Sequence, residues 1–164
     1  MADIREKIAI FLKALPAFAN LNGQNLFGLA SLFQLKVAKK GMVIYSEGDI
    51  AKGAYLIVKG DVGVYKKKLE AGTESIIAVY KKNMLFGHLA LIDAGKEHVT
   101  CKAEDDVFLL YIEKNIFFNF FTQGSAAAFA FQHMGTTALI RQLRSADELL
   151  AKISNQTPKK LNQQ

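Results

Sequence analysis

The chain of 164 residues is 51% hydrophobic, so it is long and apolar enough to bury the core of one domain and is not a disordered segment. Its single cysteine, Cys101, excludes an intrachain disulfide, and charged residues interrupt the apolar stretch near the N-terminus, so we expect a cytoplasmic protein with no membrane partner. The net charge of +6 permits an acidic partner, but the lysine runs fall at expected strand connections, and we do not expect nucleic acid to bind.

The first segment, residues 1–34, is predicted to be helical. Apolar side chains recur there at helical spacing from Ile4 to Leu15, and Pro16 then ends the first helix. A second helix is expected from about Gly23 to Phe33.

The central segment, residues 35–113, is predicted to form an antiparallel β jelly roll, which makes the chain an α+β protein. Short apolar alternations are separated there by Gly, Asn and Asp, a pattern typical of antiparallel barrels and jelly rolls. The expected strands cover residues 36–38, 43–45, 55–58, 62–65, 76–80, 99–102 and 107–112.

Helical spacing returns in residues 114–154, where a short helix, a break at Gly124 and a long C-terminal helix are expected. Apolar residues of the long helix alternate in steps of four and three over about two heptads, as in the seam of a coiled coil. This seam predicts a homodimer, and it consists of Leu139, Leu143, Ala146, Leu150 and Ile153. Residues 155–164 are polar and are expected to form a flexible tail.

Three motifs lie in order along the central segment. Gly41 to Asp49 reads GMVIYSEGD, Tyr55 to Tyr65 reads YLIVKGDVGVY, and Phe86 to Ala103 reads FGHLALIDAGKEHVTCKA. Together they resemble the cyclic nucleotide-binding domain family over roughly residues 11–121. The resemblance implies a jelly roll of the cyclic-nucleotide-binding type with N-terminal helices and a long C-terminal helix, and a regulatory role in signalling.

The third motif resembles the phosphate-binding cassette of this family, in which a Glu serves the ribose hydroxyl and an Arg binds the cyclic phosphate beside N–H groups at the start of a short helix. In this chain the Glu position is His88 and the Arg position is Glu97. The resemblance implies a degenerate ligand site, and its candidate residues are Phe86, Gly87, His88, Leu89, Ala90, Lys96, Glu97, His98 and Thr100.

A carboxylate at the Arg position repels a phosphate, and in a partly desolvated site this repulsion costs several kcal/mol. Adjacent residues of an extended segment point to opposite faces, so Lys96 does not replace the Arg without a change of register. We therefore predict that ordinary cyclic AMP binding is lost and that no cofactor is present. Two alternatives stay open: cyclic AMP or cyclic GMP bound through a rearranged cassette, and a different anion or neutral polar molecule bound through Lys96, His88 and His98.

The sequence predicts no enzyme, because it has no nucleophile elbow, Walker-type loop or zinc-protease helix, and the paired carboxylates of residues 104–106 resemble an acidic turn. Metal binding by His88, Glu97, His98 and Cys101 is the weaker interpretation, since their spacing is a poor signal, and we expect no metal. The C-terminal helix resembles the dimerisation helix of bacterial catabolite-activator relatives, which precedes a DNA-binding domain. We expect no such domain here, but a non-catalytic module with a possible protein signalling partner.

Overall fold

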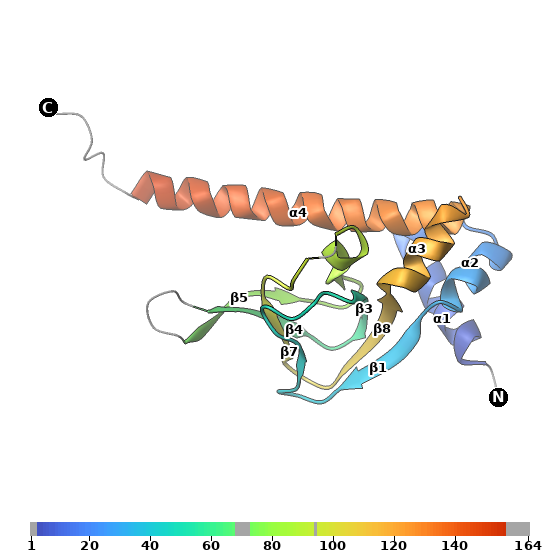
Figure 1. Cartoon of the computed structure of the whole chain (residues 1–164), viewed down its shortest axis with the longest axis horizontal. Helices are drawn as coiled ribbons and strands as arrows, with labels where there is room; N and C mark the ends of the chain where they lie inside the picture. The colour runs from blue at the N-terminus through green and yellow to red at the C-terminus, as the bar shows by residue number, and fades with distance from the viewer. Residues whose placement is uncertain (1–2, 68–72, 94, 157–164) are drawn as a thin grey trace, which may run out of the picture.

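The computed structural model describes residues 3–67, 73–93 and 95–156, and it places helices at both ends of the chain around two β-sheets (Figure 1). The N-terminal helices are α1 (Ile4–Lys13), the 3₁₀ turn η1 (Pro16–Phe18) and α2 (Gly23–Ala30). Asp3 caps α1 by accepting a hydrogen bond of 3.2 Å from the Arg5 N–H. The second helix ends three residues before the predicted Phe33, because the chain must turn there to enter the first strand at Gln34.

The predicted jelly roll is confirmed as two four-stranded antiparallel sheets. One sheet has the order β1-β8-β3-β6 and the other the order β2-β7-β4-β5. Each predicted strand is present, and the one strand that the sequence analysis missed is β6, which has two residues. The strands are β1 (Gln34–Ala38), β2 (Val43–Tyr45), β3 (Gly53–Lys59), β4 (Val62–Lys67), β5 (Glu74–Tyr80), β6 (Leu85–Phe86), β7 (Thr100–Ala103) and β8 (Val107–Glu113).

Two clusters of buried side chains form the core. Between the sheets, the apolar faces of β3, β4, β7 and β8 meet around Phe86, which is fully buried. At the helical end, Phe18 of η1 and Phe131 of the C-terminal helix stack with their ring centres 6.3 Å apart. Aromatic pairs of this kind add to the free energy of burial. The same cluster includes Leu56 of β3 and Ile112 of β8, so it fixes the helices to the first sheet.

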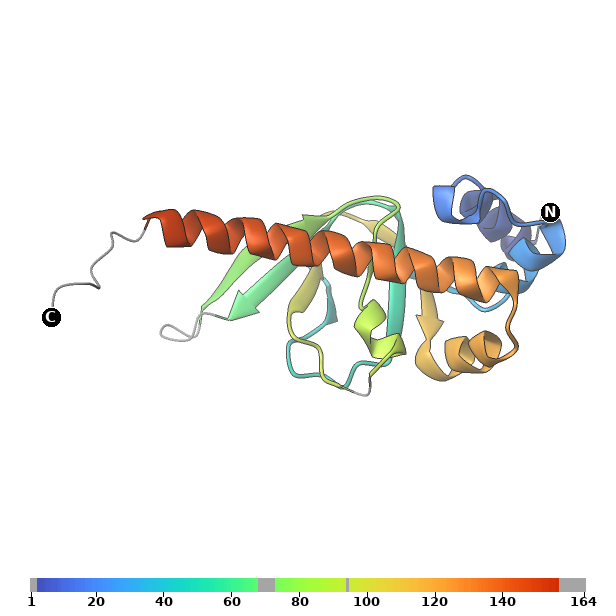
Figure 2. The same ribbon diagram turned by 90° about the horizontal axis from the view of Figure 1, so that it is seen from above.

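The C-terminal region consists of α3 (Lys114–Thr122) and α4 (Ala126–Gln156). Gly124 separates them with a φ of +68°, a backbone angle that glycine adopts readily. Seen from above, α4 crosses the sheets, with α1 and α2 on one side of its first half and α3 on the other (Figure 2). The helix continues to Gln156, two residues into the segment predicted as a tail, and residues 157–164 lie outside the described residues.

Candidate functional site

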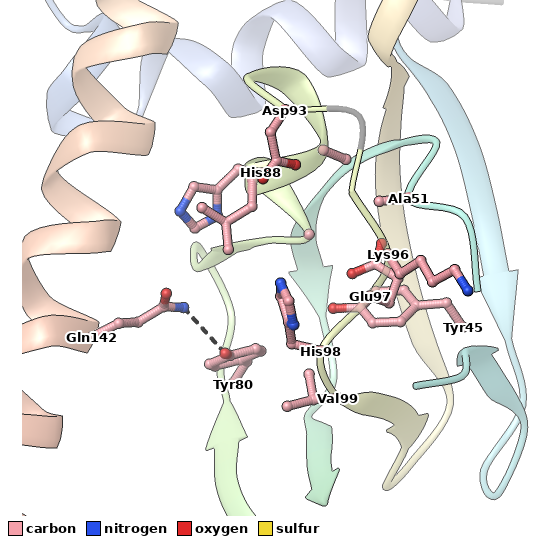
Figure 3. Close-up of a pocket in the computed structure, with 13 residues that line it drawn as sticks. Tyr45, Ala51, Tyr80, His88, Asp93, Lys96, Glu97, His98, Val99 and Gln142 are labelled. Carbon is pink, nitrogen blue, oxygen red and sulfur yellow. Dashed lines mark hydrogen bonds between the residues drawn. The ribbon is translucent and has the colours of Figure 1, made fainter. Parts of the chain in front are cut away.

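A cavity of about 160 Å³ lies between the cassette segment, the end of β2, the end of β5 and the helix α4 (Figure 3). Seven of the nine candidate site residues line it, together with residues from β2, β5 and α4 that the sequence analysis did not select. The lining residues are Tyr45, Ala51, Tyr80, Gly87, His88, Leu89, Ala90, Asp93, Lys96, Glu97, His98, Val99 and Gln142.

The backbone of the cassette is fixed at both ends. Gly87 has a φ of +67°, and a Cβ atom there would lie 3.1 Å from the Gly53 carbonyl oxygen, so glycine lets the chain leave β6 and enter the 3₁₀ turn η2 (His88–Leu91). Further along, the Glu97 N–H donates to the Asp49 carbonyl and the Gly48 N–H donates to the Glu97 carbonyl, both at 2.8 Å. These two backbone bonds set the register of residues 95–99 against the β2–β3 connection, and the register decides which side chains face the cavity.

Glu97 and Lys96 point in different directions from this clamped segment. The carboxylate of Glu97 faces the space between Tyr45 and His98, whereas the Lys96 ammonium extends away from His88 and His98 (Figure 3). Glu97 is half-buried, and within the described residues its side chain has no hydrogen-bond or ion-pair partner. Burial, and next the charge of Asp49, raise its pKa to about 7. The position that holds an Arg in the family pattern therefore carries an acid with no ion-pair partner in the described ranges.

His88 is 3% exposed, and in the described part of the molecule neither ring nitrogen has a hydrogen-bond partner. The ring lies beside α4, because a Cβ added to Gly135 would be 3.8 Å from the His88 Cδ2 atom. Burial lowers the pKa of His88, which favours the neutral imidazole with one donor and one acceptor. An unsatisfied buried polar group costs about 1–3 kcal/mol, so a polar partner for this ring would be stabilising.

Two tyrosines form the aromatic part of the wall. The rings of Tyr45 and Tyr80 lie with their centres 6.0 Å and 5.7 Å from that of Phe86, which packs behind them. Burial raises the pKa of Tyr45 far above its usual range and that of Tyr80 to about 12, so both hydroxyls stay protonated near neutral pH. Gln142 of α4 donates a hydrogen bond of 3.1 Å to the Tyr80 hydroxyl at the edge of the cavity.

Two of the predicted site residues do not line the cavity. Phe86 belongs to the core between the sheets, and the buried Thr100 hydroxyl accepts a hydrogen bond of 3.0 Å from the Glu47 N–H. Three lining residues were not predicted, because they come from segments far apart in the sequence: Tyr45, Tyr80 and Gln142. Gln142 lies three residues after Leu139 and four before Ala146, so the helical period places it, with Gly135, on the same side of α4 as the predicted seam, and that side was assigned to a dimer contact and not to a cavity wall.

The carboxylates of residues 104–106 accept hydrogen bonds from neighbouring segments of the fold. The carboxylate of Asp106 accepts a hydrogen bond of 3.1 Å from the Lys40 N–H, Asp105 accepts one from the Asp61 N–H, and Glu104 accepts one from the Tyr65 hydroxyl. These bonds agree with the interpretation of residues 104–106 as an acidic turn. Among the described residues, no three of His, Cys, Asp and Glu gather closely enough to hold a metal ion.

Cys101 is fully buried between the sheets, and burial raises the pKa of its thiol to about 12, far from the range of a reactive cysteine.

None of the helices in the described ranges 3–67, 73–93 and 95–156 has the length and apolar character needed to cross a membrane.

The family model of the cyclic nucleotide-binding domain matches residues 35–124. The chain is 27% identical over 136 residues to the cyclic AMP receptor protein of Thermus thermophilus, covering 83% of this chain and 61% of the relative. It is 28% identical over 107 residues to the cAMP-dependent protein kinase regulatory subunit of Hypocrea atroviridis, which covers 65% of this chain and 22% of that protein. The chain thus spans less than two thirds of the length of these relatives.

The crystal structure of the Thermus thermophilus catabolite activator protein superposes on this fold with a TM-score of 0.72. The two are 26% identical, and the superposition covers 85% of this chain and 63% of that one. The sheets and the long C-terminal helix therefore have the same arrangement in a protein whose sequence has largely diverged.

Proposed function

The chain belongs to the cyclic nucleotide-binding domain family, and we propose that it is a non-catalytic regulatory module that has lost ordinary cyclic AMP binding and dimerises through α4. The named relatives are a cyclic AMP receptor protein and a cyclic AMP-dependent kinase regulatory subunit, which supports a regulatory role. In such a module the family fold transmits a signal to a partner protein, and the cavity beside α4 carries out no chemistry.

The half-buried carboxylate of Glu97 carries this proposal. It lines the cavity at the position where the family pattern has an Arg, and no cation among the described residues neutralises it. A cyclic phosphate placed there loses the charge-assisted bonds of the Arg and meets like charge instead, which together should remove at least about 3 kcal/mol of binding free energy.

The size of the cavity supports the same conclusion. Its volume of about 160 Å³ is below the roughly 300–1,000 Å³ that ligand pockets usually have. The neighbouring His88 ring occupies the position of the family's ribose-binding Glu and lies beside α4. The cavity as it stands is therefore too small for a nucleotide unless α4 moves.

The dimer is supported by exposed apolar side chains on the second half of α4. Leu143 is 63% exposed and Leu150 is 64% exposed, and both belong to the predicted seam. Leu139, by contrast, is partly buried, and Ile140 and Leu149 add to the exposed apolar surface beside the seam. Covering such a surface with the same helix of a second copy would remove it from water.

Calorimetry with cyclic AMP and cyclic GMP tests the loss of binding. We expect no binding tighter than about 100 µM for either nucleotide, and a dissociation constant in the micromolar range or below would contradict the proposal. A thermal melt of the same sample is the control for folding. The melt should be cooperative and should not shift with about 10 µM nucleotide, because a ligand raises the stability of the native state only at concentrations near or above its dissociation constant.

A further inference from the structure

Resting on the proposed loss of cyclic AMP binding, we infer that the cavity beside Glu97 takes a small organic cation, such as an amine or amidine carried on a single ring. The cavity combines two aromatic walls with a carboxylate and a buried imidazole that have no partner among the described residues, and these come from four separate parts of the fold. Each of these features favours a ligand that brings positive charge and hydrogen-bond donors.

The charges around the cavity are predominantly negative. Glu97 and Asp93 line it, and Asp49 lies close enough to raise the pKa of Glu97. Lys96 is the only permanent cation among the lining residues that the structure describes, and its ammonium extends away from the cavity (Figure 3). A cationic group beside Glu97 would form the charge-assisted bonds that no described residue gives this carboxylate.

The aromatic walls suit an organic cation better than a hydrated inorganic one. Tyr45 and Tyr80 line the cavity, and Phe86 packs behind both rings. Cations bind to the faces of aromatic rings through the ring quadrupole, and a flat organic ligand also gains from apolar contact.

His88 lines the same cavity on the side of α4. It is nine-tenths buried or more, its ring points toward α4 (Figure 3), and neither ring nitrogen has a partner within the described part of the chain. A neutral imidazole can accept a hydrogen bond from an N–H of the ligand. A volume of about 160 Å³ leaves room for one ring and its substituent.

Three molecules of nearly the same shape but different charge test the inference: benzamidine, which is a cation, benzamide, which is neutral, and benzoate, which is an anion. Each is titrated to about 20 mM at about pH 8, where Glu97 is ionised, and the amide resonances of Gly87 and Gly95 are followed by NMR. We expect benzamidine to bind at least about tenfold more tightly than benzamide, with benzoate weakest, because charge-assisted hydrogen bonds are the stronger ones.

The variant Glu97→Gln should reduce the preference for benzamidine over benzamide to less than about threefold, whereas Glu148→Gln, on the exposed part of α4, should leave it unchanged. The inference is overturned if benzoate binds as tightly as benzamidine, if none of the three perturbs Gly87 or Gly95, or if the preference survives in Glu97→Gln. The comparison within the wild-type protein decides the question even if that variant does not fold.

Cyclic AMP, added to the same samples, separates this inference from the proposed function. If cyclic AMP binds at micromolar concentration, the proposed loss of nucleotide binding fails. If cyclic AMP does not bind and benzamidine shows no preference, the proposed function stands and only the inference of a cationic ligand fails.

Discussion

The Nε2 atom of Gln142 on α4 donates a hydrogen bond of 3.1 Å to the hydroxyl of Tyr80, the last residue of β5. This bond joins the long helix to the second sheet at the edge of the cavity, where both side chains line the wall. A ligand that extends between α4 and β5 would have to displace one of these two side chains. The strength of this bond therefore contributes to how tightly α4 is held against β5 beside the cavity.

We expect Gln142→Ala and Tyr80→Phe each to reduce the free energy of unfolding by about 0.5–1.5 kcal/mol, the usual net contribution of one hydrogen bond. Because both variants remove the same bond, the double variant should lose less than the sum of the two. Chemical denaturation of the four proteins measures this coupling. Strict additivity would show that the contact contributes nothing to stability.

Dimerisation through α4 gives a second prediction. Leu143→Glu places a charge in the centre of the proposed interface and should convert a dimer into a monomer, as measured by light scattering at tens of micromolar protein. The melting temperature of the sheets should change little, since Leu143 is 63% exposed and makes no part of the core.

Ser145→Glu is the matched control for this experiment, because Ser145 is exposed on the same helix but lies outside the seam. It should stay dimeric. A wild-type protein that is monomeric at these concentrations would contradict the proposed dimer, as would a Leu143→Glu variant that remains dimeric.

The raised pKa of Glu97 predicts how stability depends on pH. The pKa of Glu97 is about 7 in the folded protein, above its ordinary value of 4.5, so between these values the folded state binds more protons than the unfolded state. Its free energy of unfolding therefore falls as pH rises through this window. Near pH 8, Glu97→Gln should be more stable than the wild type by roughly 1 kcal/mol after allowance for solvent screening.

Below about pH 4.5 this difference should disappear, because Glu97 is then neutral in both states. Denaturation at several pH values checks the sign, with Glu148→Gln as the exposed control. The wild type and the variant are compared at the same pH, so the other charged and titratable groups around Glu97 are the same in both proteins. These groups are Asp49, Asp93, Lys96, His88, His98, Tyr45, Tyr55 and Cys101. A variant less stable than the wild type at pH 8 would contradict the prediction.

Much of the fold could be predicted from the sequence because its signals are local. Alternation from Val62 to Tyr65 gives a strand whose first three residues are buried, and Gly60 adopts the left-handed φ of +85° that the preceding turn requires. β6 was missed because two residues are too few for an alternating pattern. α2 was predicted too long because apolar Leu32 and Phe33 continue the helical period, while Gln34 already pairs with Tyr111 of β8.

The site was harder to predict, because its walls are assembled by tertiary packing. The motif indicated His88 and Glu97. That their side chains have no partner in the part of the chain that the structure describes follows from where α4 and the β2–β3 connection lie. Thr100 belongs to the same motif, yet its hydroxyl is bonded to the Glu47 N–H. Tyr80 and Gln142 meet only because α4 crosses the end of β5, and no local pattern contains that contact.

Restoring the two family residues gives the last prediction. The backbone of the cassette is held by the left-handed Gly87 and by the pair of bonds between Glu97 and the β2–β3 connection, none of which depends on the side chains at 88 and 97. The variant His88→Glu with Glu97→Arg should therefore keep the cassette and gain cyclic AMP affinity by about 3 kcal/mol, or roughly a hundredfold, because the Arg replaces repulsion with charge-assisted bonds.

Calorimetry with cyclic AMP compares the double variant with each single one. Glu97→Arg should give more of the gain than His88→Glu, since it removes a negative charge and adds a positive one. Gln142→Ala, added to the double variant, should improve binding further if the contact with Tyr80 restricts the space for the nucleotide. A double variant that melts cooperatively yet binds no cyclic nucleotide, with or without Gln142→Ala, would mean that the cavity is closed by its backbone and that this chain retains only the fold.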